Sequence, residues 1–194
     1  MKEDKLPNKK EKMIMKKIFS RIAILLLGLF LAAPAWTASA DDRPVIVLST
    51  ENIVSGHDKA IVTADQSTYN PDTARYTLHG NVSIQFGSRV LLTDEAKIST
   101  QTLQVWTKNN TRLHEGELCF RGGAVYAELS GGTIWFFGPN CSLKRPGLAI
   151  HSDNMSYCWN THIAVFDGHV LCIQKDKQKT ADHLEFDLSD NELH

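Results

Sequence analysis

The sequence contains few of the patterns that serve catalysis or metal binding. Its cysteines form no Cys-x-x-Cys pair and its eight histidines show no paired ligand spacing, which argues against zinc and thioredoxin-like chemistry. It also has no cupin-type His-x-His with a following glutamate, no nucleophile elbow and no glycine-rich phosphate loop. We therefore expect no catalytic site and no metal site, and we predict that the protein is not an enzyme.

An apolar run long enough to cross a membrane is also missing. Residues 1–21 carry about +5, residues 22–33 are uninterrupted apolar sequence, and Pro34 and Ala38-Ser39-Ala40 follow. Twelve apolar residues, or fifteen if the run is counted through Trp36, fall short of the roughly 20 that span a bilayer. This order is typical of a helical signal peptide over residues 1–40, with cleavage after Ala40. The alternative is an uncleaved membrane anchor.

The remaining chain lacks excess positive charge and helical periodicity. Because the whole chain has a net charge of −1, removing residues 1–40 leaves about −6. An acidic balance argues against nucleic acid as a partner, since nucleic-acid binding requires a basic face. No helical period appears after residue 41 and no stretch resembles a linker. Residues 41–194 are therefore predicted to be a single, nearly all-β domain.

A repeat offset by 88 residues organises this domain. The first copy is marked by Ala64-Asp65, Tyr69, Gly80-Asn81-Val82, Ile84 and Asp94, and the second by Asp153, Tyr157, Gly168-His169-Val170, Cys172 and Asp182. Weaker echoes at Asn109-Asn110 and Gly138-Pro139-Asn140 divide the offset into steps of about 29 residues, which is typical of stacked supersecondary units.

Side-chain alternation shows what each unit is. Between residues 74 and 86 apolar and polar residues alternate, which predicts a half-buried strand and fits no helical spacing. The alternation passes through Gly80 without losing phase, and a glycine inside a strand usually marks a bulge or bend. We expect one long strand that turns a corner there. Each unit is thus predicted to be a bent antiparallel hairpin with one apolar face.

Three further features leave alternatives open. The strand Thr133–Phe137 is apolar on both faces, so it is either covered on both sides, which we favour, or binds something on one. The strand at residues 184–188 ends the last unit halfway, which predicts an open sheet edge. Four cysteines in an exported chain allow two disulfides, yet a buried free thiol fits Cys172 equally well. These cysteines are Cys119, Cys141, Cys158 and Cys172.

The recurring acids Asp65, Asp94, Asp153 and Asp182 lie far apart in such an array. We expect them to hydrogen-bond turn backbone rather than to form a catalytic pair.

The pattern Ala-Asp-x-x-x-Tyr, a bent strand, Gly-Asn-Val-x-Ile and a further Asp resembles the OstA-like repeat of the LptA family of periplasmic lipopolysaccharide-transport proteins. The similarity is best over residues 63–98, good over 152–186 and only positional between them; His169 replaces the usual Asn. The resemblance implies an open, twisted antiparallel β-jellyroll that carries lipid A in an apolar interior. It also implies a periplasmic location, end-to-end partners of the same fold or further copies of this chain paired through edge strands, and only peripheral contact with membranes.

Taken together, the family resemblance and the alternation of apolar and polar residues predict an inner trough for lipid. Exposing an acyl chain of a dozen carbons to water costs on the order of 10 kcal/mol, so a carrier needs a continuous apolar path. The same residues could instead simply fill a closed core. Two other functions stay open: a membrane-tethered, LptC-like partner of the same fold, and a β-rich adaptor that binds no lipid. The predicted lipid-binding residues are Tyr76, Leu78, Val82, Ile84, Leu103, Val105, Ile134, Phe136, Phe166 and Val170.

Overall fold

The structure is a computed structural model that describes residues 43–48, 59–138, 140–175, 177–189 and 192–193. The predicted signal peptide lies outside these residues. Residues 42–194 form a unit separate from residues 1–41, and the description below concerns the former alone.

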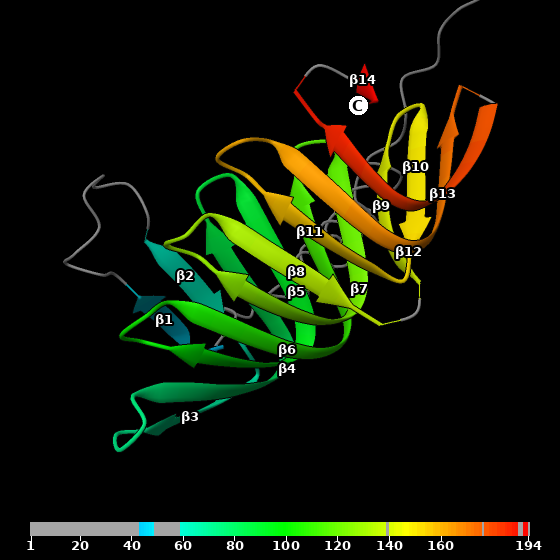
Figure 1. Cartoon of the computed structure of the whole chain (residues 1–194). Coiled ribbons are helices and arrows are strands. Elements are labelled where there is room, and N and C mark those ends of the chain that lie inside the picture. The colour runs from blue at the N-terminus through cyan, green and yellow to red at the C-terminus, as the bar shows by residue number, and fades with distance from the viewer. Residues whose placement is uncertain (1–42, 49–58, 139, 176, 190–191, 194) are drawn as a thin grey trace, which may run out of the picture. The chain divides into compact units, whose positions relative to one another are not determined.

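Every regular element that the structure describes is a β-strand, and all fourteen strands belong to one antiparallel sheet (Figure 1). No pairing among the described residues joins β1 or β3 to β13, so the sheet stays open. The prediction of an all-β, open and twisted antiparallel β-jellyroll is confirmed. The strands are β1 (Val45–Leu48), β2 (Ala60–Thr63), β3 (Gln66–Asn70), β4 (Arg75–Phe86), β5 (Arg89–Ser99), β6 (Gln104–Glu115), β7 (Leu118–Glu128), β8 (Thr133–Phe137), β9 (Cys141–Arg145), β10 (Leu148–Ser152), β11 (Asn154–Cys158), β12 (Ile163–Gln174), β13 (Lys177–Asp187) and β14 (Glu192–Leu193).

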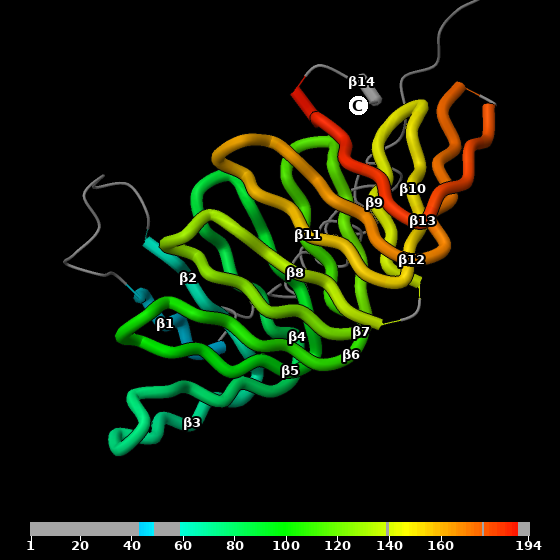
Figure 2. The backbone as a smooth tube through the Cα atoms, viewed as in Figure 1, coloured from blue at the N-terminus to red at the C-terminus, as the bar shows by residue number. Residues whose placement is uncertain are grey.

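The sheet folds into two layers, A and B. Each of its six long strands runs through both layers, with one half in layer A and the other half in layer B (Figure 2). Layer A consists of β3, β8, β11, β14 and residues 75–79, 95–99, 104–108, 124–128, 163–167 and 183–187 of the long strands. Layer B consists of β1, β2, β9, β10 and residues 82–86, 89–92, 111–115, 118–122, 170–174 and 177–181.

The corners between the layers lie where the repeat predicted them. Gly80 and Asn81 have φ values of 73° and 45°, and Gly168 and His169 have 78° and 45°. In β4 and β12 the pairing register shifts at these same residues. Glycine and asparagine adopt this left-handed backbone at least cost, which explains their recurrence. Asn109 and Asn110 do the same in β6, which confirms the corner there. The echo at residues 138–140, of which 139 lies outside the described residues, instead falls between β8 and β9.

An aspartate closes each of the two matched corners. The backbone N–H of Asp65 donates to the Gly80 carbonyl at 2.9 Å, and the Asn81 amide donates to the Asp65 carboxylate at 2.8 Å. A Cβ on Gly80 would collide with that carboxylate. In the second copy Asp153 bonds to Gly168 in the same way at 2.9 Å. Asp65 and Asp153 thus do stabilise corners, although their carboxylates bind a neighbouring side chain where we expected turn backbone. For Asp94 and Asp182 the expectation stays a prediction.

His169 makes the second corner sensitive to pH. Its Nδ1 lies 2.7 Å from Asp153 Oδ2, and this hydrogen bond, followed by the aspartate charge, raises the pKa of the histidine. Because the pKa of His169 is higher in the folded than in the unfolded protein, protonation of His169 stabilises the fold. This stabilisation is complete below the ordinary histidine pKa of about 6.5 and is lost as the pH rises through the raised pKa. We expect wild-type protein to lose stability relative to His169→Asn as the pH rises from below about 6.5 through the raised pKa of His169.

Chemical denaturation across that pH range measures this difference. Asn81→Ala, at the matching corner without a histidine, serves as the control, and its difference from wild type should not change with pH. A difference for His169→Asn that is equally flat would refute the proposed pairing.

Apolar side chains from both layers meet in one core. Phe120 of layer B stacks on Tyr157 of layer A with ring centroids 4.6 Å apart, and Phe136 of layer A lies 5.9 Å from Phe120. All three side chains are 0% exposed. The predicted single apolar face of each hairpin is therefore turned inward in both layers.

Candidate functional site

The predicted lipid-binding residues all lie at the interface between the layers. Nine of them are at most 1% exposed, and Tyr76 is half-buried against the same core. In this state their side chains pack on one another, so a lipid reaches them only if the layers move apart. Lipid binding at these positions stays a prediction.

The two sides of the interior are joined in different ways. On one side, which we call the spine, the backbone itself passes between the layers at the corners. On the other side, which we call the seam, hairpin turns of layer A face hairpin turns of layer B. Backbone hydrogen bonds between turns stay within a layer: Thr100 to Ala74, Leu129 to Leu103, Trp159 to Gly132 and Leu188 to His162 in layer A, and Lys175 to Gly147 in layer B.

Glu115 forms the polar centre of the seam. Its Oε1 accepts from Arg89 Nη2 at 2.6 Å within layer B, and its Oε2 accepts from the Tyr157 hydroxyl of layer A at 2.7 Å. The side chains of Arg89 and Glu115 are only 17% and 14% exposed. Burial, and then the bond to Glu115, raises the pKa of Tyr157, so this hydroxyl stays a donor. The carboxylate thus links the layers through one charge-assisted hydrogen bond.

Two further contacts close the seam on either side of Glu115. The Trp159 ring of layer A lies 5.3 Å from Phe86 and 5.1 Å from the Arg89 guanidinium, both in layer B. Arg145 of layer B donates to the Leu188 carbonyl of layer A at 3.1 Å. Every seam contact described here therefore depends on at least one side chain, and among the described residues no backbone ladder has to break for the layers to separate.

Sequence reasoning missed Arg89, Glu115 and Trp159. Arg89 and Glu115 are register partners in β5 and β6, 26 residues apart, which is close to the repeat step of about 29 residues. That spacing of opposite charges next to the turns Gly87-Ser88 and Gly116-Glu117 was a usable signal. The partner Tyr157 lies 42 residues beyond Glu115 and is joined to it only by the packing of the two layers.

Comparison with known family models and with curated proteins gives no match for this chain. Solved structures are similar to it, and one of them is described here. This is the crystal structure of LptH from Pseudomonas aeruginosa, the LptA homologous periplasmic component of the conserved lipopolysaccharide transport device, with a TM-score of 0.47 and 11% sequence identity. The match covers 51% of this chain and 75% of that chain.

The outer face of layer A carries an aromatic ladder that explains the doubly apolar strand β8. Trp106, Tyr126 and Trp135 are register neighbours, with ring centroids 5.7 Å and 5.4 Å apart, and Arg75 lies 4.9 Å over Trp106. The three rings are partly exposed and Phe137 is 44% exposed. The favoured interpretation, burial on both sides, is therefore wrong, because the rings cover one another rather than being covered by a neighbouring unit.

The open sheet edge that the sequence predicted at residues 184–188 is partly covered in the structure. The chain turns back after Asp187, and β14 pairs with Phe186 and Asp187, so this part of the edge is covered. The far side of β13 before Leu184 stays free of pairing among the described residues. The tail reverses because the Ser189 backbone N–H bonds to the Asp187 carboxylate at 2.8 Å, a local turn that the polar composition did not reveal.

The four cysteines, all within the described residues, are free thiols. Burial raises the pKa of Cys141 to about 11, and its thiol donates to the Gly138 carbonyl at 3.3 Å. Cys172 is buried with the core, as the apolar alternative predicted. The described residues hold no group of three or more His, Cys, Asp or Glu side chains suited to a metal ion. Within the same residues no helix is long and apolar enough to cross a membrane.

Proposed function

We propose that this protein binds lipopolysaccharide through its lipid A part and carries it across the periplasm between its two layers. The OstA-like resemblance of both repeat copies supports this function, and so does the continuous apolar interior. The observation that carries the proposal is the asymmetry between spine and seam. Backbone joins the layers along one side, whereas in the described part of the chain contacts made by side chains close the other.

The free energy needed to open the seam is smaller than the free energy gained when an acyl chain is buried between the layers. The charge-assisted bond between Glu115 and Tyr157 contributes about 1.5–3 kcal/mol, and the cation–π contact of Arg89 with Trp159 about 1–2 kcal/mol. Burying one acyl chain returns on the order of 10 kcal/mol, and the chain replaces apolar contacts that the layers lose. Lipid entering along the seam can therefore hold the layers apart, while the empty protein closes on its own side chains.

A photocrosslinking experiment tests the path of the lipid. Leu78 and Ile84 of β4 both face the interior between the layers. A photoreactive residue at either position should crosslink to lipopolysaccharide. The matched controls are Thr77 and Ser83, the adjacent outward positions of the same strand, which should give no product. Equal crosslinking at inward and outward positions, or none at any, would refute lipid carriage between the layers.

Assembly with further β-domains follows from the sheet edges. The edge strand β1 exposes Val45 and Val47 to 62% and 58%, an apolar surface suited to another strand. We propose that β1 and β13 pair with other OstA-like domains or with further copies of this chain, end to end.

Two alternatives have separate tests. A membrane-tethered partner of the same fold would retain residues 22–36 after export, whereas a periplasmic carrier would begin at Asp41; N-terminal sequencing of the exported protein decides between them. An adaptor without lipid would pair through its edges but would give no crosslink at Leu78 or Ile84.

A further inference from the structure

The outer face of layer B gathers positive charge in an otherwise acidic domain. Arg112 of β6 and Arg121 of β7 are direct register partners, and the same row continues through Ser142 of β9 to His151 of β10. Like charges directly opposite each other on a sheet face are destabilising. Within the described part of the chain, no carboxylate forms an ion pair with either arginine. Two arginines on neighbouring strands therefore face the same side of the sheet with no ion-pair partner among the described residues.

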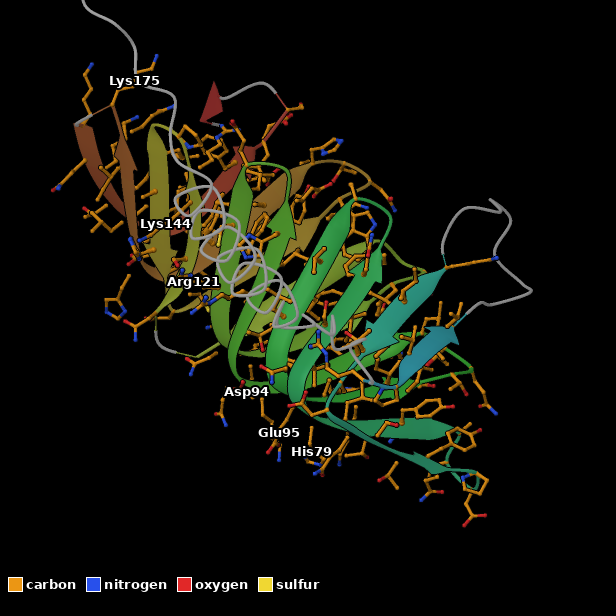
Figure 3. The ribbon with its side chains drawn as sticks, turned by 180° about the vertical axis from the view of Figure 1, so that it is seen from behind. His79, Asp94, Glu95, Arg121, Lys144 and Lys175 are labelled. Atoms are coloured by element: carbon orange, nitrogen blue, oxygen red, sulfur yellow. The ribbon has the colours of Figure 1, made fainter. Side chains whose placement is uncertain are left out.

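A hollow of about 360 Å³ lies beside this pair, and we call it the arginine hollow. None of the residues that line it is acidic. Lys144 extends outward on the neighbouring strand, and Figure 3 shows it on the same side of the sheet as Arg121. The lining residues are Asn110, Thr111, Arg112, Arg121, Gly122, Gly123, Asn140, Ser142 and His151.

Ser142 supplies a further donor at the wall of the arginine hollow. Its side chain lines the arginine hollow although the residue is only 5% exposed, and its hydroxyl makes no hydrogen bond to any described residue. Among the described residues, the only buried side-chain polar atom without a partner is Arg89 Nε, so the Ser142 hydroxyl is open to the hollow and can donate to a ligand there. Burial lowers the pKa of His151, and the charge of Lys144 lowers it further.

We propose that the arginine hollow binds a phosphoryl group, held by Arg112 and Arg121 with the Ser142 hydroxyl as a third donor. Two guanidinium forks and a hydroxyl supply more donors than the two oxygens of a carboxylate accept, whereas a phosphate monoester or diester offers enough oxygens for all of them. This site lies on the outer face of layer B, so it is separate from the interior proposed for lipid and does not depend on that function.

The test compares two sources of the same chemistry. Inorganic phosphate and glycerol phosphate are titrated into the protein by calorimetry and by amide NMR, and vesicles of phosphatidylglycerol are compared with vesicles of phosphatidylcholine by cosedimentation. We expect saturable binding, with shifted amide signals at Gly122, Gly123 and Ser142. Arg112→Gln combined with Arg121→Gln should weaken binding at least about tenfold, and Ser142→Ala several-fold.

The control variant combines Lys97→Gln with Lys108→Gln. These lysines are exposed on the outer face of layer A and make no ion pair with any described residue, so the variant removes the same charge elsewhere. Binding of soluble phosphate that only the arginine variant loses supports a site for free phosphoryl compounds. Binding of phosphatidylglycerol vesicles alone, lost in the same variant, supports a lipid headgroup. Binding of neither probe, or equal loss in the control, overturns the proposal.

Discussion

Replacing Phe120 by alanine is expected to lower the free energy of unfolding by about 3–5 kcal/mol. The ring is 0% exposed, projects from layer B, and stacks on Tyr157 and Phe136 of layer A. Its removal leaves a cavity between the layers, and the two facing rings lose their common partner. Denaturant unfolding followed by circular dichroism measures the change.

Phe137→Ala is the matched control for this experiment. Phe137 belongs to layer A but is 44% exposed on the outer face, so we expect a loss of at most about 1 kcal/mol. If the two variants were equally stable, the layers would not be packed on each other at Phe120, and the interior described above would be wrong.

Replacing Glu115 by alanine is expected to cost roughly 3 kcal/mol, at the lower end of the range for breaking a buried ion pair. The change leaves the Arg89 guanidinium and the Tyr157 hydroxyl without their common acceptor, and Arg89 Nε has no partner among the described residues even in the native protein. The loss should fall on the seam, so tryptophan fluorescence from Trp159 should report it before global unfolding.

A double-mutant cycle separates the pair from other effects. Because an unpaired buried charge accounts for most of the cost, adding Arg89→Met to Glu115→Ala should restore part of the stability. Glu117→Ala, an exposed acid in the next turn, serves as the charge control and should change stability by less than about 0.5 kcal/mol. No recovery in the double variant would show that Glu115 acts through something other than Arg89.

The strands, their buried faces and several corners could be predicted from the sequence, because each depends on residues that are close together in the chain. Alternation of side chains fixes which face of β4 is buried, and glycine or asparagine marks the corners of β4, β6 and β12 by its left-handed backbone. The repeat then carries both features from the first copy to the second. The same alternation of side chains identified the inward positions, so all ten predicted lipid-binding residues lie at the interface between the layers.

Contacts between the layers could not be predicted in the same way. Tyr157 meets Glu115, and Arg145 meets Leu188, only after two layers far apart in sequence are brought together. The outer side of β8 was misjudged because alternation shows that a face is apolar without showing what covers it. There the stacking of Trp135 on Tyr126 is a property of the register between strands.

Mass spectrometry of the protein, purified from the periplasm under native conditions, tests the central claim most directly. Lipid carriage between the layers predicts lipopolysaccharide bound in a defined ratio, and Leu78→Asp, which places a charge in the interior, should remove it while Thr77→Asp should not. Protein that folds normally but emerges without lipid, and takes up none when incubated with lipopolysaccharide, would contradict the account.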